Sequence, residues 1–397
     1  MELYLQMGHG MQSMAEEFIH LWGGGNIIIS PVNIAQDRVA GFSRKIRAAG
    51  GNVLFDPQMF YPKEGHVKLR AYDYWPQEGV SISAGNVTEN INRELLRLNK
   101  EIGSSAIILP GLEMKEDALS YGLELMNRSA IYFSSKSELP LFATLCLYPE
   151  TIRNTSVIEV LVEQLRTIPV TGFYIIPHPS NNEYIVSDPL WMMGMLKLLS
   201  CLKLFSKKTV VGYTGHQGLA YALANADGIA SGTYMNTRSF VPSKFKSPKD
   251  DDIKHKSTWF YLPTAFCEYK AALLDVAMQR GYLDSFKPQG IFYNKYSAML
   301  FSGAQPTSTN YKETNSFKHY LYCLKLQCDL LTKQTYRDTY DTYEFMLNNA
   351  ENQITEFKKR GISGQNRDFA PAIEANRVAM CANDEDYGLK LQLDWGK

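Results

Sequence analysis

The sequence lacks any long, uncharged apolar run, which argues against a membrane-spanning helix. Such a helix needs about 18 to 20 apolar residues, and the longest apolar stretch, residues 191–205, is interrupted by Lys197 and Lys203. The first ten residues, MELYLQMGHG, contain no charged segment followed by an apolar one, so we expect no secretory signal peptide. We therefore predict a cytoplasmic protein that has no membrane partner.

Cysteine is sparse and irregularly spaced. The six cysteines form no Cys-x-x-Cys pair, the spacing typical of structural zinc sites, and they make a poor disulfide framework. No HxH or HExxH spacing is present either. We therefore predict no metal site, and the sequence leaves any cofactor unknown.

An excess of charge of one sign is also absent. The 41 Lys and Arg residues are balanced by 41 Asp and Glu residues, so the chain as a whole does not attract polyanions. Nucleic-acid binding would need a local basic patch. Basic and aromatic residues do alternate in residues 244–256 and 335–345, but acidic residues interrupt both segments. A solvated surface is therefore the preferred interpretation of both.

The length of the chain allows two domains. The sequence has 397 residues, 45% of them hydrophobic, and a domain commonly has about 150 residues. Residues 241–258 are polar and charged, which indicates a linker or exposed loop between residues 1–240 and 259–397. Helix patterns at 264–281, 315–361 and 371–383 predict a mainly α-helical C-terminal domain, because no strand pattern of similar strength occurs there.

Residues 1–240 alternate between short apolar runs and helix-length amphipathic segments. Continuous apolar runs are typical of strands that are buried on both faces, as in parallel sheets. Eight such strands with connecting helices predict an α/β fold, a (β/α)₈ TIM-type barrel, with an open doubly wound sheet as the alternative. The predicted strands are residues 3–7, 26–30, 52–55, 105–109, 141–147, 172–176, 209–213 and 228–231. The predicted helices are residues 12–22, 37–49, 89–102, 116–127, 156–167, 189–205 and 219–225.

One connection is longer than the others. Residues 59–84 separate the third predicted strand from its helix, and long loops in compact domains are commonly lids or binding loops. This loop leaves the barrel at the end where active sites are built. It is either a lid or substrate wall, or an insertion without such a role.

Polar residues follow most of the predicted strands. Because barrel active sites are built from the loops after the C-terminal ends of the strands, we expect these side chains to meet at one rim. The predicted substrate-binding residues are His9, Asn33, Gln58, Gly212, Gly215, His216, Gln217, Ser231, Gly232 and Thr233.

Asp56, Glu150 and His178 are the predicted catalytic residues. Asp56 directly follows a buried strand, where a carboxylate is costly unless it is paired or hydrogen-bonded, so a role as general base, nucleophile or metal ligand is expected. A turn cap before Pro57 is the alternative. Glu150 would be the second carboxylate of an acid–base pair, or else a loop residue. His178, between two prolines, would be an acid–base group or an ordinary loop histidine.

Residues 212–218 contain three glycines, and residues 231–233 read Ser-Gly-Thr. Loops after the last two strands, together with a helix N-terminus, form the common phosphate cradle of such barrels. A nucleotide or a phosphorylated small molecule is therefore the predicted ligand. The alternative is that these glycines only allow close packing of strand and helix.

Three segments resemble the tRNA-guanine transglycosylase-like barrels. NVLFDPQMF (52–60) resembles their third-strand segment with its DSGGFQ-type loop, VVGYTGHQGLAYALANADGI (210–229) resembles the seventh strand and helix, and MNTRSF (235–240) is similar to the PTR after strand eight. The resemblance implies substrate recognition or general-base duty for Asp56. The family's nucleophilic Asp falls on Gly232 here, and its Cys-rich zinc segment is absent.

Three functions remain open. The first is an enzyme that acts on a nucleotide, nucleobase or phosphorylated ligand, in its boldest form transglycosylase-like on tRNA or DNA. The second is a small-molecule lyase, aldolase or hydrolase on the same barrel. The third is a non-catalytic barrel subunit of a larger assembly, with the helical domain as its protein-binding interface. The fold alone supports all three.

Overall fold

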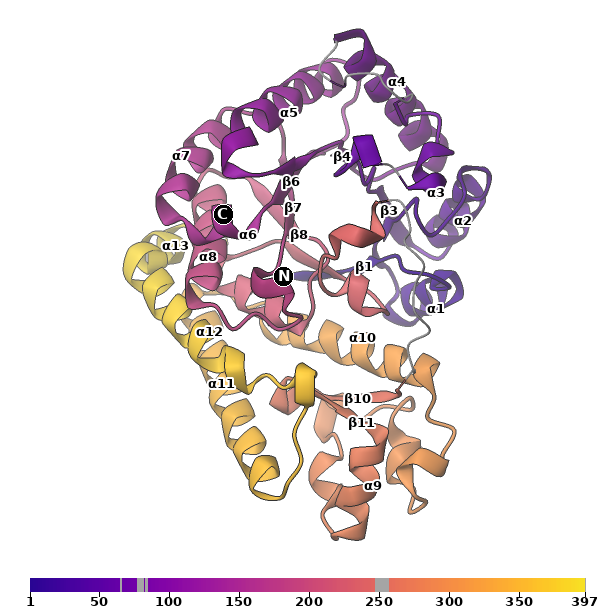
Figure 1. The fold of residues 1–397 in the computed structure, drawn as a ribbon, viewed down its shortest axis with the longest axis vertical. Helices are drawn as coiled ribbons and strands as arrows, with labels where there is room; N and C mark the ends of the chain where they lie inside the picture. Colours follow the sequence, from indigo (N-terminus) through magenta and orange to yellow (C-terminus); the bar gives the residue numbers. More distant parts are fainter. Residues whose placement is uncertain (65, 77–81, 83–84, 247–256, 397) are drawn as a thin grey trace.

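A curled parallel sheet surrounded by helices forms the larger part of the molecule, and a mainly helical region follows it (Figure 1). The computed structural model describes residues 1–64, 66–76, 82, 85–246 and 257–396. Parts of the predicted long loop 59–84 and of the predicted linker 241–258 lie outside these ranges. No helix within them is long and apolar enough to cross a membrane.

All eight predicted strands are present, and they pair in parallel in the order β3-β2-β1-β9-β8-β7-β6-β4. Each consists mainly of buried apolar residues, as expected for strands covered on both faces. The strands are β1 (Glu2–Gln6), β2 (Gly25–Ile29), β3 (Gly51–Phe55), β4 (Ile107–Leu109), β6 (Leu141–Leu147), β7 (Gly172–Pro177), β8 (Lys208–Val211) and β9 (Gly228–Ser231).

The two edge strands of this sheet approach each other. Between β3 and β4 the described residues form no strand ladder, but the Ser105 N–H donates to the Val53 carbonyl over 2.9 Å. The sheet is therefore strongly curled, and the carboxyl ends of its strands face one common side.

A ninth strand, β5 (Glu113–Met114), was not predicted. It pairs in parallel with the last two residues of β6, while β4 pairs with the first three. The chain from β4 to β5 thus follows β6 along its length, with an interruption at residues 110–112. This arrangement brings Glu113 to the carboxyl end of the sheet.

Helices cover the outside of the sheet, close to their predicted positions. The first, α1, spans Gln12–Trp22 as predicted. The predicted helix at 219–225 is instead a 3-10 helix, His216–Ala224. The other helices of this part are α2 (Gln36–Ala48), α3 (Val67–Arg70), α4 (Gly85–Ile102), α5 (Leu119–Ser134), α6 (Pro149–Arg153), α7 (Thr155–Arg166) and α8 (Pro189–Leu204).

The C-terminal region is mainly helical, but it begins with an antiparallel hairpin that was not predicted. The predicted helix at 264–281 is wrong in its first half, because residues 267–270 form a strand that pairs with the aromatic-rich residues 259–262. The predicted helix at 315–361 is two helices, the second capped by the Thr335 side chain. The elements are β10 (Trp259–Leu262), β11 (Cys267–Lys270), α9 (Ala271–Gln279), α10 (Glu313–Leu330), α11 (Tyr336–Lys359), α12 (Ala370–Asn383) and α13 (Leu389–Asp394).

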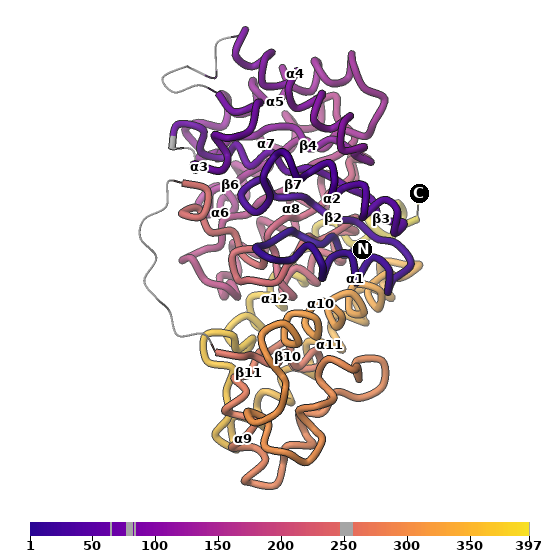
Figure 2. Tube along the Cα trace, turned by 90° about the vertical axis from the view of Figure 1, so that its right-hand side faces the viewer, coloured from indigo at the N-terminus to yellow at the C-terminus, as the bar shows by residue number. Residues whose placement is uncertain are grey.

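Helix α10 lies between the curled sheet and the hairpin, with α9 at the far end of the molecule (Figure 2). A buried ion network joins the two parts. The Glu268 carboxylate of β11 accepts from Arg238, which follows β9, over 3.1 Å and from Arg367 over 2.7 Å. The Tyr184 hydroxyl donates to the other carboxylate oxygen over 3.0 Å. The Arg238 guanidinium also lies 3.5 Å from the centre of the Tyr320 ring in α10.

The Glu268 network predicts a large loss of stability on Glu268→Gln. The variant would leave Arg238 buried without its counter-charge, and breaking a buried ion pair costs about 3–5 kcal/mol. Urea denaturation measures the free energy of unfolding. As a matched control, Glu351→Gln removes the exposed pair with Arg377, for which about 0–1 kcal/mol is expected. Equal, small effects of both substitutions would contradict the prediction.

Candidate functional site

The carboxylate of Asp56 lies fully buried inside the curled sheet, directly after β3. Its Oδ1 accepts the Gln58 N–H over 3.0 Å, and its Oδ2 accepts the Tyr213 hydroxyl over 2.7 Å. The Tyr174 hydroxyl of β7 lies 3.3 Å from the same oxygen. Donors from the far side of the sheet therefore converge on one carboxylate.

Further buried polar groups extend this network. The Gln58 side-chain amide donates to Ser30 Oγ over 2.7 Å and to the Tyr213 hydroxyl over 2.8 Å. The Tyr174 hydroxyl donates to Gln6 Oε1 over 2.8 Å, whereas Gln6 Nε2 has no hydrogen-bond partner among the described residues. A buried donor without a partner is costly, so the interior of the sheet retains hydrogen-bonding capacity beside Asp56.

Burial raises the pKa of Asp56 to about 6, although the hydrogen bonds from Tyr213, Gln58 and Tyr174 favour the ionised form. Desolvation disfavours the charged carboxylate more than these donors stabilise it. A carboxyl group with this pKa can accept or release a proton near neutral pH.

Four aromatic rings pack together beside the Asp56 network. Tyr213, which bonds to Asp56, lies 5.5 Å from the rings of Phe240 and Phe245 and 6.4 Å from Phe60, measured between ring centroids. Phe240 and Phe245 stack on each other at 5.2 Å. They belong to residues 240–246, so the first part of the predicted linker packs onto the sheet.

A second polar cluster surrounds His178, which follows β7. His178 Nε2 lies 3.1 Å from Glu113 Oε1, the same oxygen that accepts the Tyr61 hydroxyl over 2.6 Å. The Cys146 sulfur lies 3.7 Å from the same ring nitrogen. Burial, together with the nearby Lys115 and Lys246, lowers the pKa of His178 to about 4. The imidazole is therefore neutral at pH 7.

The two lysines lie over aromatic rings at the same rim. Lys115 Nζ is 4.8 Å from the centre of the Tyr148 ring, and Lys246 Nζ is 4.4 Å from that of Tyr61. The His178 ring contacts Phe240 at 4.6 Å between centroids. The His178 cluster therefore adjoins the aromatic rings that contact Asp56.

The structure does not place Glu150 in this cluster. Glu150 is exposed in the first turn of the short helix α6, which was not predicted, and its catalytic role stays a prediction. Glu113 is the carboxylate that meets His178. Glu113 was not predicted as a site residue, because Pro110-Gly111 is typical of a turn that ends the strand. The one sequence signal for it was the Glu113-Met114 pair directly after that turn.

Residues 212–218 are buried beneath the C-terminal region. His216 lies 5.0 Å from the Tyr261 ring and 5.7 Å from Phe369, between centroids, and burial lowers its pKa to about 4. The Gln217 side chain bonds to both backbone groups of Val186. A Cβ at Gly212 would lie 2.5 Å from the Tyr174 hydroxyl. The segment is thus closely packed, and the substrate-binding role of Gly212, His216 and Gln217 stays a prediction.

The remaining predicted residues lie in three places. Asn33 joins the Asp56 network, because its amide donates to Ser30 Oγ over 3.0 Å and to the Met7 carbonyl over 3.2 Å. Gly215 and Ser231 lie buried near the interface with the C-terminal region. His9 and Thr233 line a separate cavity. The substrate-binding role of these residues stays a prediction.

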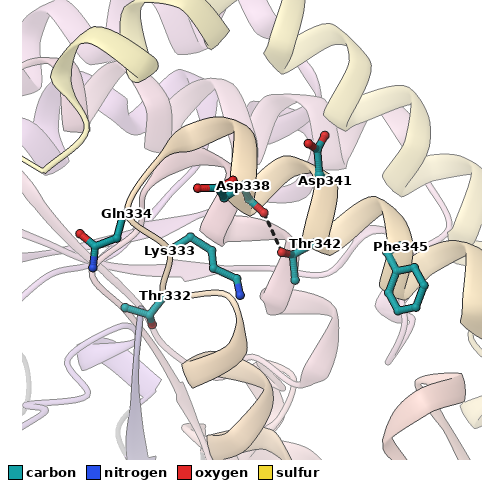
Figure 3. Close-up of a pocket in the computed structure, with 7 residues that line it drawn as sticks. All are labelled: Thr332, Lys333, Gln334, Asp338, Asp341, Thr342 and Phe345. Carbon is teal, nitrogen blue, oxygen red and sulfur yellow. Dashed lines mark hydrogen bonds between the residues drawn. The ribbon is translucent and has the colours of Figure 1, made fainter.

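A larger cavity, of about 570 Å³, lies where α10 ends and α11 begins (Figure 3). Its wall includes Thr332, whose hydroxyl accepts a hydrogen bond from the N-terminal amine of Met1 over 2.9 Å. It therefore lies near the amino-terminal end of β1. Active sites of parallel barrels form at the opposite, carboxyl ends of the strands, so this cavity is not the candidate site.

Within the described ranges, no three His, Cys, Asp or Glu side chains stand close enough to hold a metal ion. No family model and no curated protein sequence match the chain.

Two solved structures resemble part of the fold. The HpcH/Hpal aldolase/citrate lyase family protein from Burkholderia cenocepacia J2315 is 12% identical, with a TM-score of 0.33, over 58% of this chain and 86% of that one. The 3-dehydroquinate dehydratase from Aquifex aeolicus VF5 is 11% identical, with a TM-score of 0.33, over 61% of this chain and 92% of that one. At these TM-scores neither neighbour bears on the function of this chain.

The raised pKa of Asp56 predicts how stability depends on pH. The native state holds the proton up to about pH 6, whereas an unfolded Asp releases it near its ordinary pKa of 3.8. The protonated form therefore favours folding, and this contribution is lost as the pH rises through 6. At ~1.4 kcal/mol per pKa unit the loss is about 3 kcal/mol.

The measurement compares the free energies of unfolding of the wild type and Asp56→Asn from pH 4 to pH 8. Asparagine does not titrate, so the variant should gain about 3 kcal/mol relative to the wild type over this range. Tyr213→Phe keeps the carboxylate and removes a hydrogen bond that lowers the pKa of Asp56. The free energy of unfolding of this variant should therefore fall more steeply with pH than that of the wild type. A constant difference between Asp56→Asn and the wild type would refute the prediction.

Proposed function

We propose that this chain is an enzyme that acts on a nucleobase-containing ligand, with Asp56 as the group that recognises the base and transfers its proton. The observation that supports the proposal is the buried Asp56 carboxyl, which has a pKa of about 6 and adjoins a cluster of aromatic rings. A nucleobase is planar and carries N–H donors on its edge, so it matches both features. The proposal takes the curled sheet as a closed barrel, supported by the Ser105–Val53 hydrogen bond between its edges.

The aromatic rings suit a planar ligand. Phe60, Tyr213 and Phe240 present faces and edges within 7 Å of one another, and aromatic side chains stack on bases whatever their sequence. Gln58 and Asp56 place an amide and a carboxylate next to these rings. Amide and carboxylate side chains form hydrogen bonds with the donors and acceptors on the edge of a base. Entry of the ligand requires rearrangement of the buried Phe240 and Phe245 side chains.

The lysines at the rim suit the phosphate of a nucleotide. Lys115 and Lys246 both lie within reach of His178 and each covers a tyrosine ring. Lysine next to aromatic rings is the combination that binds single-stranded nucleic acid. A chain without net charge needs a local basic patch to bind nucleic acid, and these two lysines would supply it.

A transglycosylase-like reaction would differ here from the resembled family. Position 232, where that family has its nucleophilic Asp, is Gly232, and a Cβ there would lie 2.3 Å from the Gln6 carbonyl oxygen. No carboxylate fits at this position without movement of β1. The exchange would then proceed by direct displacement at the sugar carbon, where the C–N bond to the incoming base forms as the C–N bond to the outgoing base breaks. Asp56 would accept the proton of the incoming base and return it to the outgoing base.

The His178 cluster favours a second function, a lyase or hydrolase that acts on a small molecule. His178 and Glu113 form a hydrogen-bonded pair at the rim, and a neutral imidazole oriented by a carboxylate can accept a proton from a bound ligand. In that function Glu113 and His178 perform the chemistry, and Asp56 is structural.

The test is incorporation of labelled guanine into tRNA and into duplex DNA by the full chain. We expect incorporation by the wild type and a loss of at least about 100-fold in Asp56→Asn, since a positioned acid–base group contributes about 10²–10⁴-fold. Glu374→Gln, an exposed change in α12, is the matched control and should retain full activity.

Three results separate the functions. Normal incorporation by Asp56→Asn would remove Asp56 from the mechanism. A wild type that neither incorporates nor binds guanine would overturn the nucleobase proposal. An activity on small carbonyl compounds that is lost in Glu113→Gln and kept in Asp56→Asn would establish the second function instead.

A further inference from the structure

An open groove of about 660 Å³ lies between α1 and α2, which stand side by side outside the sheet (Figure 1). One wall is the part of α2 that carries Arg38, Gly41 and Lys45, and the other is the start of α1 with the loop before it. The two helices follow the carboxyl ends of β1 and β2, and β2 pairs with β3, which ends just before Asp56. The groove therefore begins on the same side of the sheet as the Asp56 site.

The exposed cations of α2 differ from those of several other helices. On α4, α5, α7 and α11, an exposed arginine pairs with a carboxylate three or four residues away in its own helix. Arg38, Arg44 and Lys45 are exposed as well, yet none of them forms an ion pair or a side-chain hydrogen bond with the residues that the structure describes. The one acidic residue of α2 is Asp37, in its first turn. The outer face of α2 thus carries an excess of positive charge.

Two residues of this face are unfavourable for the helix itself. Arg38 stands in the first turn of α2, where the helix dipole disfavours a cation. Gly41 stands in the helix interior, where glycine is less favourable than alanine, and a Cβ at this position would have nothing within 4 Å. Internal packing therefore does not explain the glycine. Residues that weaken their own element are expected at functional sites, and these two line the same groove.

The arrangement of the cations suits a chain of phosphates. Arg38 and Lys45 are about 10 Å apart along the axis of α2, because each of the seven residues between their positions rises by about 1.5 Å. A nucleic-acid strand carries one phosphate per nucleotide, so successive phosphates can contact both side chains. Gly41 lies between them and allows the strand to approach the helix backbone closely.

A lipid surface fits this face less well. Helices that bind membranes insert large apolar side chains between the lipids. The large apolar residues of α2, Val39, Phe42 and Ile46, are buried in the protein. Its outer face offers only cations and small residues, which suits the surface of a nucleic acid.

Glu16 of α1 carries the opposite charge on the other wall of the groove. It is half-buried, and it forms no ion pair with the described part of the chain. A carboxylate repels phosphate, so Glu16 limits how closely a strand can approach α1. Its removal should therefore strengthen the binding of a polyanion.

We propose that the outer face of α2, formed by Arg38, Gly41, Arg44 and Lys45, binds the phosphate backbone of a nucleic acid without regard to its sequence. The choice of a nucleic acid rests on the proposed function, in which the ligand carries a nucleobase. The groove leads to the carboxyl end of the sheet, so a strand bound there would present a base on the side where Asp56 lies.

The experiment measures the binding of a labelled single-stranded RNA and a labelled duplex DNA to the full chain by fluorescence anisotropy, at about 50 to 200 mM salt. We expect Arg38→Gln and Lys45→Gln each to weaken binding and to lower the slope of log Kd against log salt by about 1. Lys359→Gln, which removes an exposed cation of α11 that pairs with Glu356, is the matched control and should keep the wild-type slope.

Two further variants separate binding from folding. Gly41→Gln should melt at a higher temperature than the wild type, because glutamine favours a helix, and it should nevertheless bind the strand more weakly because its side chain fills the groove. Glu16→Gln should bind more tightly than the wild type. A merely structural role of these positions would change stability and leave affinity unaltered.

The proposal is overturned if the wild type binds neither polymer, if Arg38→Gln and Lys45→Gln keep the wild-type slope, or if vesicles that contain phosphatidylserine bind more tightly than both polymers. Binding of either polymer with the expected slopes supports it, and the tighter of the two identifies the partner. Asp56→Asn should bind as the wild type does and lose only guanine incorporation, so the two proposals can fail separately.

Discussion

The burial of one carboxylate is the constraint that organises the interior of the sheet. Asp56 is completely removed from water, and a buried carboxylate is tolerated only with hydrogen-bond donors around it. One donor is the Gln58 N–H in the loop after β3. The others are the hydroxyl groups of Tyr174, which belongs to β7, and of Tyr213, which follows β8. This network also constrains Gln58, Ser30 and the aromatic rings, because each of them contacts a residue that donates a hydrogen bond to Asp56.

The carboxyl face of the sheet has two halves that differ in what covers them. From β3 to β7 it carries Asp56, Glu113 and His178, with lysines at the rim. From β8 to β9 its loops are buried under the C-terminal region, where Arg238 and Glu268 make an ion pair whose side chains are both 2% exposed. The candidate site and the attachment of the C-terminal region thus occupy different halves of one rim.

The sequence predicts those features that depend on local pattern. Continuous apolar runs place all eight strands, and a carboxylate directly after a buried strand identifies Asp56. Features that depend on distant partners were out of reach. Glu113 becomes part of the site only because the chain resumes pairing with β6 after Pro110-Gly111. The packing of residues 212–218 depends on Tyr261 and Phe369 from the C-terminal region, which no local pattern connects to them.

Burial raises the pKa of Asp56 and lowers that of His178, so the usual order of the two pKa values is reversed. Asp56, with a pKa of about 6, holds its proton to a higher pH than His178, with a pKa of about 4, although an ordinary carboxyl is the stronger acid. At pH 7 the carboxylate is ionised and the imidazole is neutral, so both groups accept protons. Under the proposed function, a reaction at this site near neutral pH would therefore begin with removal of a proton from the ligand. The proton that a leaving group needs would come from Asp56 after its protonation in that step, so that one carboxyl group would serve in turn as base and as acid.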